Sequence, residues 1–193
     1  MSFLQNLQTR KTALKRTETL VTCVDGTRYI EKHSSCTNID EIVPLEATTG
    51  FVIDTAPDAI PAMVVPNLYV GSQDCCAPDV LFAYGIKVVL SVGIESPHKV
   101  PAVMYTHVEC LDLPETKLSH VITRCNAVIT SAMNECNNIL VHCNAGVSRS
   151  AAVIIGYLML EMKMPYNDAY QLLKSVRSCV QPNPGFVKQL KNM

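Results

Sequence analysis

The stretch Asn138–Leu160, which reads NILVHCNAGVSRSAAVIIGYLML, decides the fold. Residues 138–142 are largely apolar, which predicts a buried strand, and residues 148–163 are apolar almost all round, which predicts a helix at the centre of a domain. Residues 143–150 connect the two as a strand-to-helix loop. The amide groups of such a loop face the space beyond the strand, at the positive end of the helix dipole. We therefore expect an anion-binding loop at the end of a buried strand.

The flanking sequence alternates between strand and helix patterns from residue 63 onwards. Further strands are predicted at 68–70, 86–92 and 104–110. Helices are predicted at 78–84, at 118–133, where one apolar stripe recurs at helical spacing, and after Pro165, where Asn167 or Asp168 can cap the helix. Strands interleaved with helices predict a three-layer α/β fold, in which helices flank a central, mostly parallel sheet.

The first 62 residues differ from the rest and predict an N-terminal extension ahead of a main domain at 63–193. Residues 20–24 and 27–31 flank Asp25-Gly26, a two-residue turn that is typical of a β-hairpin. Residues 36–62 contain five acidic side chains, no basic one and three prolines. This composition predicts an extended acidic connector.

Composition restricts the class of protein. The 193 residues are 48% hydrophobic, with a net charge of −1, so the chain can bury a core and charge does not favour nucleic-acid binding. The longest apolar run, at 151–160, is too short to span a membrane, and the N-terminus has no apolar signal segment. The nine cysteines are odd in number and contain no C-x-x-C pair, which argues against a disulfide framework or a zinc module. We expect a protein of the cytoplasm, or of the cytoplasm and nucleus, with no metal.

Only Cys143 has neighbours that indicate chemistry. Gly146 can take a positive φ, and the guanidinium of Arg149 can fold back over the loop to bind two phosphate oxygens. The loop amides, the helix N-terminus and Arg149 all favour a thiolate at Cys143. Ser150 can donate a hydrogen bond to the sulfur and help it leave. The residues expected to bind the phosphate group are Asn144, Ala145, Gly146, Val147, Ser148 and Arg149. The alternative, a core cysteine beside a surface arginine, does not account for this context.

Cleavage of a phosphate ester also needs an acid for the departing oxygen. Asp112, in the loop 111–116, is the first candidate, and Glu115 competes with it. His142 is interpreted as a hydrogen-bonding residue that positions the loop, because side chains alternate along a strand and a residue before an outward Cys143 points inward.

The pattern His142-Cys143-x-x-Gly146-x-x-Arg149-Ser150 resembles the signature of the cysteine-dependent protein phosphatases, and of their dual-specificity branch in particular. Three further stretches resemble that family: Pro66–Ser72, the acid loop at 111–118, and Arg177 followed by Pro182–Phe186, in which Asn183 would support the loop. The closest resemblance is to small atypical members that act in stress-activated kinase pathways. Ser91 and Ser178 depart from the family pattern, and we expect neither to touch the chemistry.

The resemblance implies a protein-tyrosine-phosphatase-like fold and a two-step reaction. In it Cys143 attacks phosphorus, Asp112 protonates the leaving group, and water cleaves the phosphocysteine. No cofactor is implied. The substrates implied are phosphoproteins, with protein kinases of a MAP-kinase-type pathway expected among them.

The uncharged loop positions Asn144, Ala145, Val147 and Ser148 argue against a phosphoinositide or RNA-triphosphate substrate. A pocket that accepts both phosphotyrosine and phosphoserine or phosphothreonine is expected.

Two other interpretations remain open. The same fold could recognise phosphate or scaffold kinases with little turnover, using the basic stretch Arg10–Arg16. A rhodanese-type loop is disfavoured, because it lacks the acid loop and the Pro-Asn context.

Overall fold

The computed structural model describes residues 18–22, 28–32, 41–44 and 58–193. They belong to two compact units, Met1–Thr48 and Thr49–Met193. Within the described ranges, we find no helix with the length and apolar character that crossing a bilayer requires.

The first unit contains a three-stranded antiparallel sheet. Its strands are β1 (Glu18–Thr22), β2 (Arg28–Lys32) and β3 (Glu41–Pro44), in the order β1-β2-β3. Thr22 lies opposite Arg28, so β1 and β2 pair where the sequence predicts a hairpin, although its Asp25-Gly26 turn lies outside the described residues. β3 falls in the segment predicted to be a connector. Ile42 and Val43 give that short segment the branched side chains that favour a strand.

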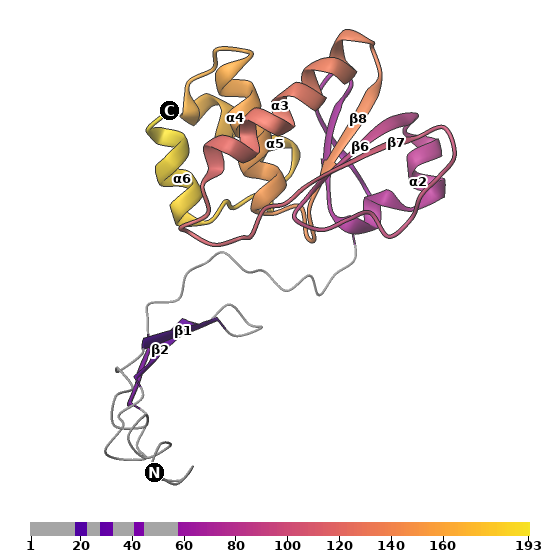
Figure 1. Ribbon diagram of the computed structural model, residues 1–193. Helices are drawn as coiled ribbons and strands as arrows, with labels where there is room; N and C mark the ends of the chain where they lie inside the picture. Colours follow the sequence, from indigo (N-terminus) through magenta and orange to yellow (C-terminus); the bar gives the residue numbers. More distant parts are fainter. Residues whose placement is uncertain (1–17, 23–27, 33–40, 45–57) are drawn as a thin grey trace, which may run out of the picture. The chain divides into compact units, whose positions relative to one another are not determined.

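The second unit is built on a five-stranded sheet with the strand order β4-β5-β8-β6-β7 (Figure 1). The strands are β4 (Ala62–Val65), β5 (Leu68–Gly71), β6 (Ile86–Val92), β7 (Met104–Val108) and β8 (Asn138–His142). β4 is antiparallel to β5, and every other pairing is parallel. The helical elements are the 3-10 turn η1 (Gln73–Cys76) and the helices α2 (Pro78–Ala83), α3 (Leu118–Asn134), α4 (Arg149–Leu160), α5 (Tyr166–Val176) and α6 (Pro184–Lys191).

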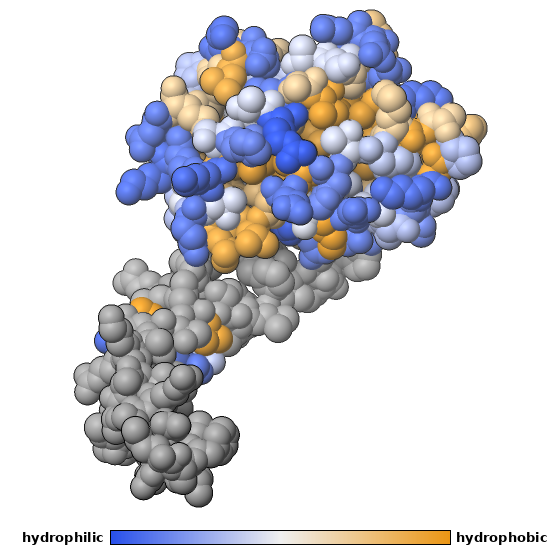
Figure 2. Space-filling model, in the orientation of Figure 1, coloured by the Kyte–Doolittle hydropathy of each residue, from blue (hydrophilic) through white to orange (hydrophobic). Residues whose placement is uncertain are grey.

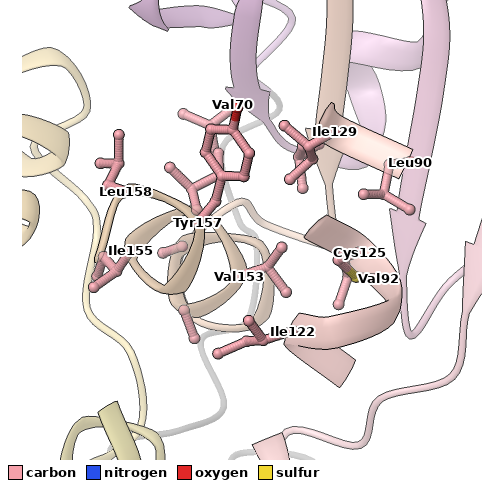
Figure 3. Packing of buried hydrophobic residues seen from close by; sticks show 14 of the residues in the cluster. Val70, Leu90, Val92, Ile122, Cys125, Ile129, Val153, Ile155, Tyr157 and Leu158 are labelled. Atoms are coloured by element: carbon pink, nitrogen blue, oxygen red, sulfur yellow. The ribbon is translucent and has the colours of Figure 1, made fainter. Parts of the chain in front are cut away.

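Two buried clusters show that helical layers cover both faces of the sheet. Ile139 and Val141 of β8 belong to the larger cluster, with α3 and α4, whereas Leu140 belongs to the smaller one, with α2 and η1. This separation follows from the two-residue alternation of side chains along a strand. Figure 3 shows residues of α4, such as Val153, beside Ile122 of α3 and strand residues. The predicted three-layer α/β fold with a mostly parallel sheet is confirmed.

The second unit differs from the prediction in one cap and in two short elements. The cap of α5 is Pro165, with no side-chain cap hydrogen bond, so neither Asn167 nor Asp168 is the cap. β4 and α6 were not predicted, because four and eight residues are too few to establish a clear period.

The surface of the second unit, seen from one side in Figure 2, mixes hydrophilic residues with apolar patches.

Candidate active site

The loop 143–148 connects β8 to α4, at the carboxyl end of a strand with neighbours on both sides. Each of its first five carbonyl oxygens has a hydrogen-bonding partner. That of Cys143 lies 3.2 Å from Nδ1 of His142. The carbonyls of Asn144 and Val147 accept from the backbone N–H groups of Gln73 and Gln181, at 2.8 and 2.9 Å. Arg177 donates to the remaining two, at Ala145 and Gly146.

These anchored carbonyls fix where the loop amides point. In a trans peptide group the C=O and the following N–H face opposite ways, and the described residues contain no cis bond. The N–H groups of residues 144–148 are therefore directed away from the anchors. Among the described residues, none of these amides donates a backbone hydrogen bond. The loop thus presents successive donors beside the start of α4, an arrangement suited to an oxyanion.

Gly146 is required at the middle of this loop. Its φ is +67°, in the left-handed region that favours glycine. A Cβ there would lie 2.6 Å from the carbonyl oxygen of Gly71 and 2.9 Å from Nη2 of Arg177. Any side chain at this position would push the loop off its anchors.

The proposed nucleophile, Cys143, lies in the loop that precedes α4. Cys143 is 2% exposed, and its Sγ lies 3.3 Å from Oγ of the buried Ser150. The side chain of Arg149 is 14% exposed, and its Nε lies 3.8 Å from Oδ2 of Asp112. The structure therefore gathers the predicted cysteine, serine, arginine and acid at one end of the sheet, and Arg149 does not extend into solvent.

The carboxyl group of Asp112 is tied to the loop. Oδ1 accepts hydrogen bonds from Ser148 Oγ and from Asn183 Nδ2, both at 2.7 Å. Burial raises the pKa of Asp112, against the opposing effects of these hydrogen bonds and of Arg149. A carboxyl group with a raised pKa keeps its proton to higher pH, which suits an acid. The competing candidate, Glu115, is exposed.

Asn183 connects three parts of the site. Its Nδ2 bonds to Asp112, its backbone N–H donates to Ser148 Oγ at 3.0 Å, and its Oδ1 accepts from Phe186 N at 2.9 Å, which caps α6. This is the place at which the sequence predicts a supporting asparagine. The side chain of Ser148 takes part in the same network, so this residue offers more than the amide predicted for it.

His142 is fully buried and bonded on both ring nitrogens. A carbonyl can only accept, so Nδ1 carries the proton that is donated to Cys143 O. Nε2 then accepts from Ser91 Oγ at 2.7 Å. Burial lowers the pKa of His142 to about 4, which keeps the ring neutral at physiological pH.

Ser91 is therefore linked to the loop indirectly, through His142, a role that the sequence did not predict for it. β6 pairs with β8 in parallel and places Ser91 opposite His142. The sequence also predicted no role for Gln73 and Gln181, which contact the loop, or for Asp58, which contacts it through Arg177. Gln73 and Gln181 bond the loop through backbone N–H groups, which leave no signal in the sequence, and Asp58 lies outside the signature.

The other buried thiols are held in the protonated form. Burial raises the pKa of Cys76, Cys110 and Cys125 to about 12. Within the described part of the chain, no three His, Cys, Asp or Glu side chains gather into a metal-ligand cluster.

Comparison with known proteins shows the family to which the chain belongs. The family described as "Dual specificity phosphatase, catalytic domain" matches residues 68–193, which include the acid loop, the 143–148 loop and α6. The chain belongs to the dual specificity phosphatase family. A probable dual specificity protein phosphatase of Dictyostelium discoideum is 36% identical, over 97% of this chain and 95% of that protein. Mouse dual specificity protein phosphatase 19 is 33% identical, over 92% of this chain and 83% of its own length.

Solved dual specificity phosphatase structures share the fold. The crystal structure of human DUSP28 aligns with a TM-score of 0.66 at 31% identity, covering 71% of this chain and 93% of that one. A mouse putative dual specificity phosphatase, crystallised with zinc tungstate, aligns with a TM-score of 0.66 at 31% identity, covering 73% and 89%. Membership in the dual specificity phosphatase family supports protein phosphatase activity and implies phosphoprotein substrates.

Proposed function

We propose that this phosphatase hydrolyses phosphotyrosine and phosphoserine or phosphothreonine through a phosphocysteine intermediate. Cys143 attacks phosphorus as the thiolate while Asp112 gives its proton to the departing hydroxyl oxygen. The sulfur–phosphorus bond forms and the ester bond breaks. Arg149 and the amides of residues 144–149 hold the equatorial oxygens, and they bind more tightly as charge develops in the transition state.

In the second step water attacks the phosphocysteine. Asp112, now ionised, takes a proton from that water, and inorganic phosphate leaves. Ser150 donates a hydrogen bond to the departing sulfur and stabilises it as the thiolate, which returns the enzyme to its starting form. The distance of 3.3 Å between Cys143 Sγ and Ser150 Oγ supports this role.

The single observation that carries the proposal is the anchored loop beside Cys143. Five carbonyls are bonded on its outer side, so the amides are directed to the opposite side before any substrate arrives. His142 and Asn183 support this arrangement from the strand side and from the start of α6.

The uncharged side chains at positions 144, 145, 147 and 148 support phosphoprotein substrates over polyphosphorylated lipids or RNA. We place the substrates among protein kinases of a MAP-kinase-type pathway, on the basis of the family resemblance.

Hydrolysis of a small aryl phosphate, inhibited by vanadate, tests the reaction. Cys143→Ser should abolish turnover, and undiminished turnover would contradict the mechanism. Ser150→Ala should slow the second step, so that aryl alcohol appears in a burst followed by a slower steady rate. A chain that binds vanadate but turns over no substrate would be a phosphate-binding scaffold instead.

Substrate choice is tested separately. Doubly phosphorylated activation-segment peptides of a MAP kinase should lose both phosphotyrosine and phosphothreonine. A phosphoinositide offered at the same concentration should be hydrolysed far more slowly. Faster release from the lipid would contradict the substrate class.

A further inference from the structure

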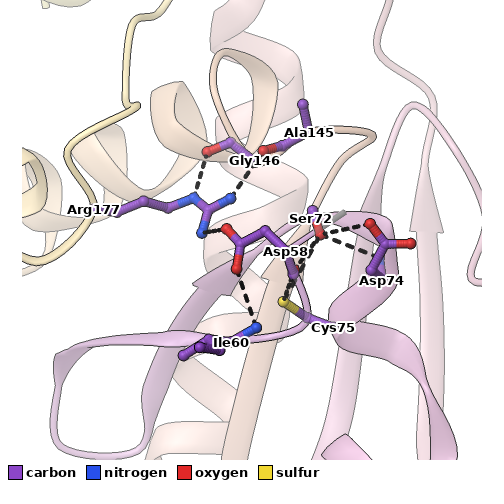
Figure 4. A network of polar contacts seen from close by, with 8 residues as sticks. All are labelled: Asp58, Ile60, Ser72, Asp74, Cys75, Ala145, Gly146 and Arg177. Atoms are coloured by element: carbon purple, nitrogen blue, oxygen red, sulfur yellow. Dashed lines mark hydrogen bonds and ion pairs between the residues drawn. The ribbon is translucent and has the colours of Figure 1, made fainter. Parts of the chain in front are cut away.

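The carbonyl side of the 143–148 loop is bonded to the buried guanidinium of Arg177. Arg177 donates from Nε to Gly146 O at 3.1 Å and from Nη2 to Ala145 O at 3.0 Å, while its remaining nitrogen, Nη1, pairs with Oδ2 of Asp58 at 2.5 Å. Figure 4 shows the guanidinium between the loop and the Asp58 carboxylate. One cation therefore joins the loop to a residue that precedes β4.

Asp58 is held firmly for a residue outside any helix or strand. Its Oδ1 accepts from Ile60 N at 3.1 Å. Its carbonyl oxygen accepts from Ser72 Oγ at 2.7 Å and from Cys75 Sγ at 3.2 Å, and both of these donors are on buried residues. Asp58 also lies ahead of Leu68, where the family match begins. A residue outside the matched region is thus fixed against the back of the site.

The burial of Arg177 explains why the acid is needed. This side chain is only 6% exposed, and a buried cation is costly unless it has a counter-charge. The two loop carbonyls supply dipoles, and Asp58 supplies the negative charge.

Arg177 also acts on the inner side of the loop. A cation bonded to a carbonyl polarises the whole peptide group and makes its N–H a stronger donor. The groups polarised here carry the N–H of Gly146 and the N–H of Val147, both directed away from Arg177.

We propose that Asp58 and Arg177 form a positioning pair that holds the 143–148 loop in its oxyanion-binding shape, a proposal that rests on the proposed function of this loop. Neither side chain touches substrate in this scheme. Asp58 orients Arg177, and Arg177 orients the two central peptide groups of the loop.

The sign of one substitution effect separates positioning from simple electrostatics. Removing the negative charge of Asp58 would strengthen the binding of an anion if only through-space Coulomb forces mattered. Loosening Arg177 from the loop would weaken it. Because the Asp58 side chain is 36% exposed, Asp58→Asn removes no packing from the core, and its effect falls on Arg177, which loses its counter-charge.

The test compares Asp58→Asn with Asp74→Asn in the full chain. Both remove one carboxylate from the same network, but in the described part of the chain Asp74 contacts Ser72 and makes no ion pair with Arg177. Vanadate affinity is measured by calorimetry and kcat/KM with an aryl phosphate. We expect Asp58→Asn to weaken vanadate binding and kcat/KM about tenfold, since small displacements of binding groups are costly, and Asp74→Asn to change both less than about twofold. Unchanged or tighter vanadate binding by Asp58→Asn would contradict the proposal that Asp58 and Arg177 position the loop.

Coupling to Arg177 completes the test. In an Arg177→Lys background, adding Asp58→Asn should cause little further loss of vanadate affinity. Asp58→Glu alone, which keeps the carboxylate, should retain most of the vanadate affinity of the unmodified chain. A full, additive loss in the Arg177→Lys background would contradict action through Arg177. If the unmodified chain binds vanadate but turns over no aryl phosphate, the proposed function fails, while the calorimetric comparison still decides the pair.

Discussion

Two opposing effects act on the carboxyl group of Asp112. Burial favours its neutral form, and hydrogen bonds from Ser148 and Asn183 favour the charged form; burial prevails and raises the pKa. We expect Asp112→Asn to lower kcat about 10²–10⁴-fold, because the leaving oxygen loses its proton donor. In the unmodified enzyme the rate should fall as rising pH ionises Asp112, and this alkaline limb should disappear from the pH–rate profile of the variant.

The matched control is Glu115→Gln, which removes the neighbouring acid of the same loop. It should leave kcat and the alkaline limb nearly unchanged. A larger loss of kcat in Glu115→Gln than in Asp112→Asn would show that Glu115 is the acid.

The raised pKa of Asp112 also predicts that removing this carboxyl group stabilises the fold at neutral pH. Because the folded-state pKa of Asp112 lies above the ordinary value of 3.8, ionisation at neutral pH disfavours the folded state. Asp112→Asn should therefore raise Tm at pH 7, and the difference from the unmodified chain should shrink as the pH falls toward 3.8. Thermal unfolding at several pH values would measure this, and a variant that is less stable at pH 7 would contradict it.

The lowered pKa of His142 predicts that the stability of the fold decreases as the pH falls. Burial lowers its folded-state pKa to about 4 from 6.5, so the unfolded chain binds a proton first as the pH falls. The stability gained from a neutral His142 is fully present above pH 6.5 and decreases between 6.5 and about 4. Denaturant unfolding of His142→Gln should lack this part of the slope. An identical slope in both chains would show that other groups cause it.

Among the elements, α4 depends on a close contact with α3. A Cβ added at Gly156 would lie 2.5 Å from Cδ1 of Ile122. Gly156→Ala should destabilise the fold, since overpacking costs about 1–3 kcal/mol and alanine gains about 1 kcal/mol over glycine in a helix interior. Adding Ile122→Val removes the crowded methyl group and should recover part of the loss in Tm. A Gly156→Ala chain more stable than the original would contradict the contact.

The elements that the sequence predicts best have a clear period. The stripe of α3 and the apolar runs of β6 and β8 locate those elements within one or two residues. β4 and α6 escape prediction because they are short, and in β4 only Val64 is buried. The candidate site divides in the same way. Residues contiguous with Cys143 are visible in the signature, whereas Ser91 and Asp58 reach the loop from other segments, which only the tertiary fold reveals.

For the whole molecule, the positioning pair locates the start of the functional domain ahead of Asp58, within the second unit that begins at Thr49. A chain starting at Thr49 should keep the kcat/KM of the full chain. One starting at Ile60 lacks Asp58 and should lose about tenfold in kcat/KM, as expected when a binding group is displaced. Aryl phosphate hydrolysis by the two chains provides the comparison, and equal activity would place the boundary after Asp58.

The bonded carbonyls of residues 143–147 have a consequence for how a ligand associates. Ordering these backbone units costs about 1–2 kcal/mol per residue in conformational entropy, and this cost arises during folding and not when the ligand binds. A preorganised receptor of this kind need not close around its guest. Association of an oxyanion should then proceed in a single kinetic phase, without a slow isomerisation step.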